Sequence, residues 1–138
     1  MGAAIALVFA NIGAAYGTAK SAIGIANLGV VNVDKIFRAL IPIIMAGILG
    51  IYGLIVAVLM ASKVGKSDAV EGYQQFTAGI CCGFSALASG LAIGVAGEAG
   101  VKAYAQTDAV FVGMILILIF AEAIGLYGLI IAIILTTG

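Results

Sequence analysis

One carboxylate lies in the middle of the most hydrophobic stretch of this chain. Residues 110–135, VFVGMILILIFAEAIGLYGLIIAIIL, contain Glu122 near their centre and no other charged residue. At about 1.5 Å per residue, a helix of this length crosses a hydrocarbon core of about 30 Å. A charged side chain at that depth costs about 2.5 to 3.5 kcal/mol. The pattern therefore predicts an acid that is neutral because it holds a proton, or one that is hydrogen-bonded to a neighbouring helix. The first of these is a proton carrier, and the second is a structural acid.

The rest of the chain has the composition of an integral membrane protein. Hydrophobic residues make up 64% of the 138 positions, charged residues only 9%, and there are 20 glycines. The few charges separate long uncharged runs, which predicts an all-α membrane protein with four transmembrane helices. The expected helices cover about residues 2–31, 40–61, 75–104 and 110–135.

The polar residues lack the patterns that are typical of nucleic-acid, metal and nucleotide binding. The formal net charge is zero and the charges are scattered, so no nucleic-acid surface is expected. Cys81 and Cys82 are adjacent within an apolar run, without the CxxC spacing or histidines of a metal site. The Gly65-Lys66-Ser67 run lacks the first glycine of a phosphate-binding loop, because Met60 stands there. We expect no catalytic residue, metal or cofactor, and the chain is not an enzyme by itself.

Small residues distinguish the first and third expected helices from the other two. Glycines recur on one face of each at spacings of three, four or seven. Such stripes let two membrane helices approach closely, so these glycines are predicted to be packing positions. They are Gly13, Gly17 and Gly24 in the first helix, and Gly83, Gly90, Gly94 and Gly97 in the third.

The two halves of the chain are repeats. Residues 51–59, IYGLIVAVL, match residues 126–134, LYGLIIAII, at an offset of 75. We therefore predict two duplicated helical hairpins in the same orientation, 1–66 and 67–138, with the acid only in the second. The repeat aligns Gly47 with Glu122. A tight inner layer and a bulky, lipid-facing outer layer predict that many copies assemble into a ring.

Motifs along the whole chain resemble one known family. They are GAAYGTAKS in the first helix, LASGLAIGVAGEAGVKAYAQ in the third, and the repeated YGL after IPIIMAGILGI and after ILILIFAEAIGL. The chain resembles the proteolipid, or c, subunit of eukaryotic vacuolar-type proton-translocating ATPases. The resemblance implies a homo-oligomeric or mixed proteolipid ring, a rotor driven by ATP hydrolysis in a separate soluble sector. It further implies that Glu122 is reversibly protonated as it passes an arginine-bearing stator subunit, and that the ring contacts central-stalk subunits and acidifies a vacuole or another endomembrane compartment.

The residues around the expected site favour protons over sodium. Sodium-transporting relatives place oxygen-bearing side chains at positions that match Ile48, Leu49 and Ile93, which offer no oxygen ligands. Tyr52 and Tyr127 are candidate hydrogen-bond partners of Glu122, although each is equally well explained as a packing or interfacial tyrosine. Gly47 is expected to leave room beside Glu122 on an adjoining helix.

Basic residues predict the orientation in the membrane. Those near the first and third connections outnumber those near the second, so these two connections are expected in the cytosol and both termini in the lumen. They are Lys35, Arg38 and Lys102, with Lys20 nearby, against Lys63 and Lys66. Two other functions stay open at this point: a small four-helix proton-coupled antiporter, and a structural membrane channel protein.

Overall fold

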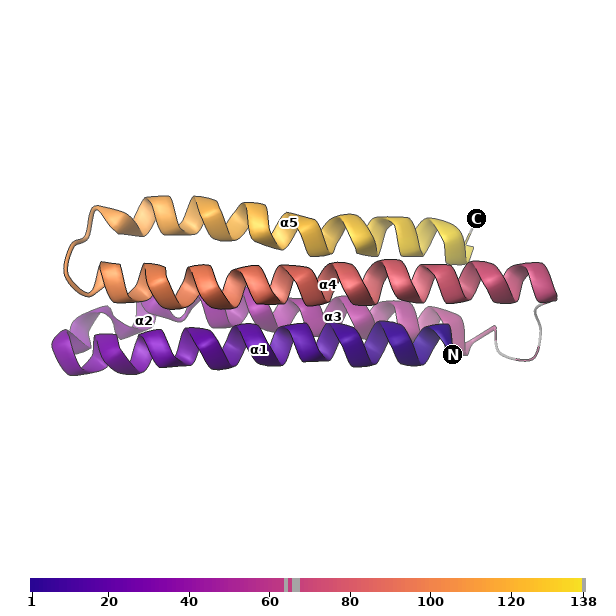
Figure 1. The fold of residues 1–138 in the computed structure, drawn as a ribbon, viewed down its shortest axis with the longest axis horizontal. Coiled ribbons are helices and arrows are strands. Elements are labelled where there is room, and N and C mark those ends of the chain that lie inside the picture. The colour runs from indigo at the N-terminus through magenta and orange to yellow at the C-terminus, as the bar shows by residue number, and fades with distance from the viewer. Residues whose placement is uncertain (64, 66–67, 138) are drawn as a thin grey trace.

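The structure is a bundle of long helices that run side by side along one axis (Figure 1). It is a computed structural model that describes residues 1–63, 65 and 68–137. The elements are α1 (Gly2–Val31), η1 (Val33–Lys35), α2 (Ile36–Ala39), α3 (Ile41–Ala61), α4 (Ala69–Tyr104) and α5 (Val110–Thr137). Within these residues, four helical segments are long and apolar enough to cross a membrane: α1, the run from Val33 to Ala61, α4 and α5. The all-helical fold with four membrane helices is confirmed.

The start of α4 differs from the sequence prediction. The helix begins at Ala69 rather than near residue 75, because the Asp68 carboxylate caps it by accepting a hydrogen bond from the Glu71 backbone N–H at 2.9 Å. The predicted start was wrong because the first turns of α4 are polar and lie outside the hydrophobic run. A cap of this kind stabilises the first turn without any apolar burial.

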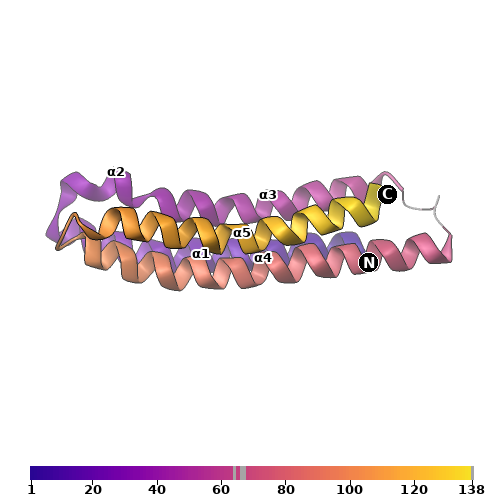
Figure 2. The same cartoon turned by 90° about the horizontal axis from the view of Figure 1, so that it is seen from above.

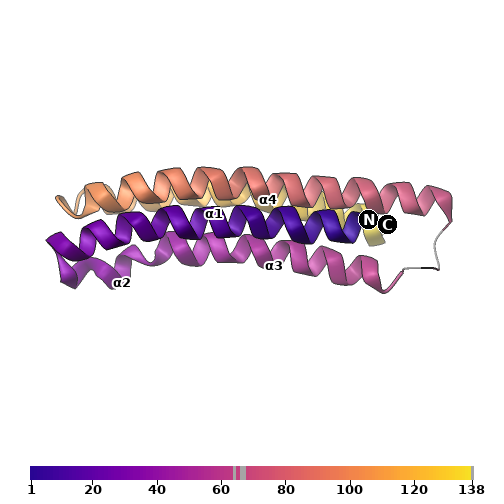
Figure 3. The ribbon, with the colours of Figure 1, turned by 60° about the horizontal axis from the view of Figure 1, so that its bottom comes forward.

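The small-residue helices form the middle of the bundle. α1 packs along α4, while α3 packs on α1 and α5 packs on α4. Figure 1 shows α4 between α1 and α5, and Figure 3 shows α1 between α3 and α4. The outer helices α3 and α5 also contact each other, and they overlap in the view from above (Figure 2). The two hairpins therefore contact each other both through the inner helices α1 and α4 and through the outer helices α3 and α5.

Glycines set the separation of α1 from α4. A methyl group built on Gly13 would lie 2.5 Å from the carbonyl oxygen of Ala86, and one built on Gly90 would overlap the Gly13 backbone. The other predicted packing glycines also lie where a Cβ would press on a neighbouring helix; these are Gly17, Gly24, Gly83, Gly94 and Gly97. Larger residues would force the helices apart, so the small side chains account for the close approach.

The two ends of the bundle differ. The start of α1, the end of α3, the start of α4 and the end of α5 lie at one end, and the α1–α3 and α4–α5 connections lie at the other (Figure 1). The hairpins thus run in the same direction, as the repeat predicted. The predicted division into 1–66 and 67–138 falls outside the described residues and stays a prediction.

Candidate functional site

Glu122 lies near the middle of α5, on the side of that helix that turns toward the rest of the bundle. Its neighbours on this face, Ala121 and Gly125, are buried, and Glu122 itself is half-buried. A carboxyl group is therefore held inside the bundle at about half the length of a membrane-crossing helix. This is the depth that the sequence predicted.

The carboxyl group of Glu122 has no hydrogen-bond partner among the described residues. Both of its oxygens are buried. Tyr52 on α3 is the polar side chain that faces the carboxyl, but its hydroxyl does not reach hydrogen-bonding geometry. The salt bridges found in the described part of the chain involve other carboxylates. Since a buried carboxylate without a cation or donor is costly, the protonated form suits this environment.

Apolar side chains surround the same turn of α5. Leu49 on α3 and Ile93 on α4 are fully buried in the core cluster that contains Ala121. Gly125 provides the space for Leu49, because a Cβ there would lie 2.6 Å from Leu49 Cδ2. The described residues contain no cluster of histidine, cysteine or acidic side chains that could hold a metal ion.

Ser89 is a site residue that the sequence did not suggest. It is fully buried on α4, and its hydroxyl donates to the carbonyl oxygen of Ala121 at 2.6 Å. Most other hydroxyl donors in the described chain bond instead within their own helix, as Thr136 does to Ala132 at 2.7 Å. In sequence, Ser89 reads as one more small residue beside Gly90. Only the contact across helices shows that it fixes the turn that carries Glu122.

The other two candidate residues lie away from Glu122 within one chain. Tyr127 is 63% exposed on α5. Gly47 is exposed on α3, and a Cβ built on it would meet nothing within 4 Å. Of the residues predicted to support the acid, the structure therefore brings Tyr52 to it, whereas the roles of Tyr127 and Gly47 stay predictions.

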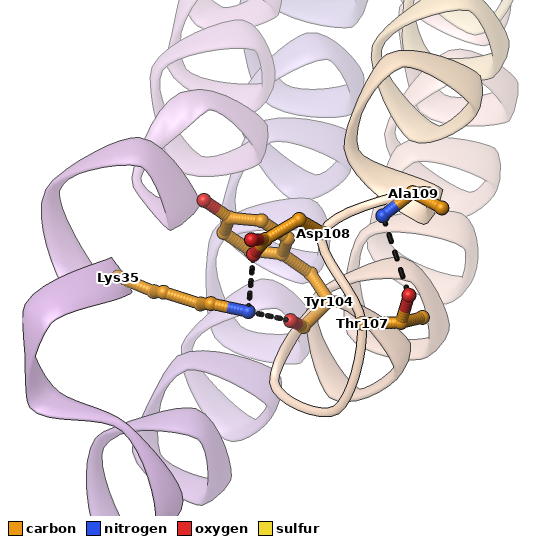
Figure 4. A network of polar contacts seen from close by, with 5 residues as sticks. All are labelled: Lys35, Tyr104, Thr107, Asp108 and Ala109. Atoms are coloured by element: carbon orange, nitrogen blue, oxygen red, sulfur yellow. Dashed lines mark hydrogen bonds and ion pairs between the residues drawn. The ribbon is translucent and has the colours of Figure 1, made fainter.

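A polar cluster joins the two connections at the far end of the bundle (Figure 4). The Lys35 ammonium lies 2.5 Å from Asp108 Oδ1 and donates to the carbonyl oxygen of Tyr104 at 2.8 Å. It also lies 4.6 Å from the centre of the Tyr104 ring. The hydrogen bond and charge of Lys35 hold the pKa of the Asp108 carboxyl below its usual range, and Arg38 adds to this effect. The cluster ties the first hairpin to the second.

Comparison with known proteins gives a consistent result. The family model that describes the C subunit of ATP synthase matches residues 1–60 and again residues 76–135. The chain is 54% identical over 138 residues to the 16 kDa proteolipid of the V-type proton ATPase of Homo sapiens, its c subunit, covering 99% of this chain and 89% of the human one. It is 52% identical over 141 residues to one of the corresponding 16 kDa proteolipids of Caenorhabditis elegans, with 99% and 88% covered. It is 54% identical over 144 residues to the V-type proton ATPase 16 kDa proteolipid of Chrysotila carterae, again with 99% and 88% covered.

Proposed function

Since this chain belongs to the family of the ATP synthase C subunit, as a proteolipid of the V-type proton ATPase, we propose that Glu122 carries the transported proton. The chain is a multi-pass membrane protein and a component of the proton-translocating rotor. It does not itself hydrolyse ATP. Within such a rotor, one group must accept a proton, move with the ring and release the proton elsewhere.

The observation that carries this proposal is the unpartnered carboxyl of Glu122. A structural acid in a membrane protein is held by donors or a cation, because an unsatisfied buried charge is strongly unfavourable. Both oxygens of Glu122 are buried without such a partner in the described residues. A protonated carboxyl tolerates this position, and a cation supplied from outside the chain is then needed for its deprotonation. This favours a carrier over a structural role.

In the proposed cycle, a cation from outside the chain drives the deprotonation of Glu122. Glu122 takes a proton from a cytosolic half-channel and travels as a neutral acid through the apolar part of the membrane. When rotation brings it beside an arginine of the stator, the positive charge stabilises the carboxylate and the proton leaves through a second half-channel. The apolar neighbours Leu49 and Ile93 favour the neutral form between these two encounters.

The transported ion is inferred to be a proton rather than sodium. A sodium ion inside the membrane needs several oxygen ligands in place of its water. Besides the carboxyl, the described side chains near this turn offer the hydroxyls of Tyr52 and Ser89, and the second of these is already bonded to Ala121. Leu49 and Ile93 contribute only carbon. This set is too small for a dehydrated cation.

The proposal includes a ring of proteolipids, a stator and a central stalk. The outward surface is widely apolar, as Phe120 at 73% and Ile44 at 60% exposure illustrate, so it suits lipid or further copies of the chain. We infer that the connections around Lys35 and Asp108 face the cytosol and the stalk, and that the termini are lumenal in a vacuolar or other acidic compartment. Basic residues near these connections support this orientation.

The test is ATP-driven acidification of sealed vesicles that carry either the native chain or Glu122→Gln. Glutamine has nearly the same size but cannot release a proton, so we expect the variant to assemble and fail to pump. The Thr137→Val variant serves as the control for assembly and handling, because Thr137 is an exposed residue at the end of the same helix and its hydroxyl bonds only within that helix. Equal acidification by native and Glu122→Gln vesicles would show that the acid is structural. Protection of Glu122 from dicyclohexylcarbodiimide would point the same way.

A further inference from the structure

The contact between α3 and α5 beside Glu122 has two parts, a projecting side and a receiving side. Leu49 and Tyr52, three residues apart, project from α3. Glu122 and Gly125, also three residues apart, receive them on α5: Leu49 fills the space at Gly125, and Tyr52 faces the Glu122 carboxyl. Residues at this spacing share one face of a helix, so the two pairs form one continuous contact.

Because the two halves of the chain are repeats, residues that correspond to each side of this contact also occur on the other helix. At the offset of 75, Leu49 corresponds to Ile124 and Tyr52 to Tyr127, so α5 also carries a projecting side. Both residues are exposed, at 43% and 63%. Nothing within the described chain packs over this side as α5 packs on α3.

The receiving side is repeated on α3. Glu122 corresponds to Gly47 and Gly125 to Gly50. These two glycines line a groove between α1 and α3, together with Leu7, Asn11, Ala14, Ile51 and Leu54. A Cβ on Gly47 would meet nothing within 4 Å, so the groove has room for a side chain at that point. On the first hairpin, the receiving side therefore has no side chain of the described residues packed into it at Gly47. On the second hairpin, the projecting side chains Ile124 and Tyr127 have no helix of the described chain packed over them.

We propose that copies of this chain join head to tail, with Ile124 and Tyr127 of one copy seated in the Gly47–Gly50 groove of the next. The two hairpins run in the same direction. The rotation that brings the second hairpin beside the first can therefore be repeated, and it then places the first hairpin of a neighbouring copy beside the second hairpin of this one. Such a heterologous contact closes into a ring when the rotation fits. This proposal rests on the ring assembly above and assigns the surface through which neighbours meet.

The groove also contains a polar group that a second copy would satisfy. Asn11 is exposed, and its Oδ1 lies 2.7 Å from the position of a Cβ on Gly50. An amide on an apolar membrane surface is unfavourable unless it finds a hydrogen-bond partner. The phenolic hydroxyl of an incoming Tyr127 supplies one. The interface between copies thus places Tyr127 beside Gly47, whereas the corresponding contact within the chain places Tyr52 beside Glu122.

The first experiment is cysteine cross-linking in the assembled complex. Two differently tagged copies carry Gly47→Cys and Tyr127→Cys, in a chain whose Cys81 and Cys82 are replaced by alanine, and a short bis-maleimide joins nearby thiols. We expect a cross-linked product that carries both tags. The matched control pairs Tyr127→Cys with Leu91→Cys, because Leu91 lies two residues after Ser89 and hence on the opposite side of α4 from α5. A product only in the control pair, or in neither pair, overturns the proposal.

A second variant covers the case in which the cysteine chains assemble poorly. Gly47→Leu has room within one chain, so it should leave the isolated protomer folded but lower the temperature at which the ring dissociates. Gly72→Leu is the control, because that helical glycine also has nothing within 4 Å of its Cβ position and lies near the start of α4. Equal ring stability for both variants contradicts the proposed surface. If Glu122→Gln abolishes pumping while these tests fail, the surface is wrong and the proton site stands; if Glu122→Gln pumps, the proposed function has failed instead.

Discussion

Replacing Ser89 by alanine removes the hydrogen bond that joins α4 to α5 beside Glu122. The hydroxyl is fully buried and donates to the Ala121 carbonyl at 2.6 Å. Hydrogen bonds between membrane helices average about 0.6 kcal/mol and reach about 1.7 kcal/mol in double-mutant cycles. Because Ala121 lies inside α5, its carbonyl also accepts a backbone bond within that helix, so the substitution leaves no acceptor wholly unpaired. We therefore expect Ser89→Ala to lower the free energy of unfolding by about 0.5 to 1 kcal/mol.

We expect Ser89→Ala to slow proton pumping clearly, although it lowers the free energy of unfolding only slightly. With the bond gone, the turn that carries Glu122 is less firmly fixed against α4, so we expect slower pumping at equal levels of assembly. Unfolding is measured by circular dichroism during titration with sodium dodecyl sulfate, and pumping in the same vesicles as above. Thr136→Val is the control, because it removes a buried hydroxyl that bonds within its own helix. If Ser89→Ala pumps at the native rate, the bond is only structural; a loss of unfolding free energy above about 2 kcal/mol would mean that the carbonyl depends on Ser89.

Three further predictions follow from other contacts. Gly90→Ala should lower the melting temperature, since the added methyl group overlaps the α1 backbone and overpacking costs about 1 to 3 kcal/mol, while Gly72→Ala should not. Tyr52→Phe should slow acidification without changing assembly, because it removes the hydroxyl that faces the acid; unchanged pumping would limit that hydroxyl to packing. Because the pKa of Asp108 is lowered in the folded state, its bond to Lys35 stabilises the fold above about pH 4 and is lost as the pH falls further. Asp108→Asn should therefore reduce the dependence of melting temperature on pH in that acidic range, and an unaltered dependence would contradict the role of this pair.

The membrane helices were predictable where hydrophobicity alone decides their bounds. The first helix was expected at residues 2–31, and α1 spans Gly2–Val31. The last was expected to begin at residue 110, and α5 begins at Val110. The N-terminus of α4 was not predictable from hydrophobicity, because the Asp68 cap stabilises a polar first turn. The error arose where a hydrogen bond, rather than burial, determines the bound.

The site could be predicted only in part. Glu122 was identifiable because it is the single charge in an apolar run, and its position follows from helix geometry. The sequence treats Tyr52 and Tyr127 alike, since the repeat aligns them, and only the packing of α3 against α5 separates the buried contact from the exposed one. Ser89 could not be distinguished from the small residues around it, because its role depends on which carbonyl of another helix it meets.

Only the second of the two repeats carries the acid, and this sets how many protons each turn of the rotor carries under the proposed mechanism. The duplicated chain provides two equivalent positions, Gly47 and Glu122, of which one can bind a proton. Under the proposed mechanism, a ring of such chains would therefore carry half as many protons per turn as a ring of equal circumference with an acid in every hairpin. If the ATP consumed per turn is fixed by the soluble sector, the free energy available to each proton doubles. If Glu122 is the proton site, as proposed, one acid per duplicated chain thus favours a steep proton gradient over a large proton flux.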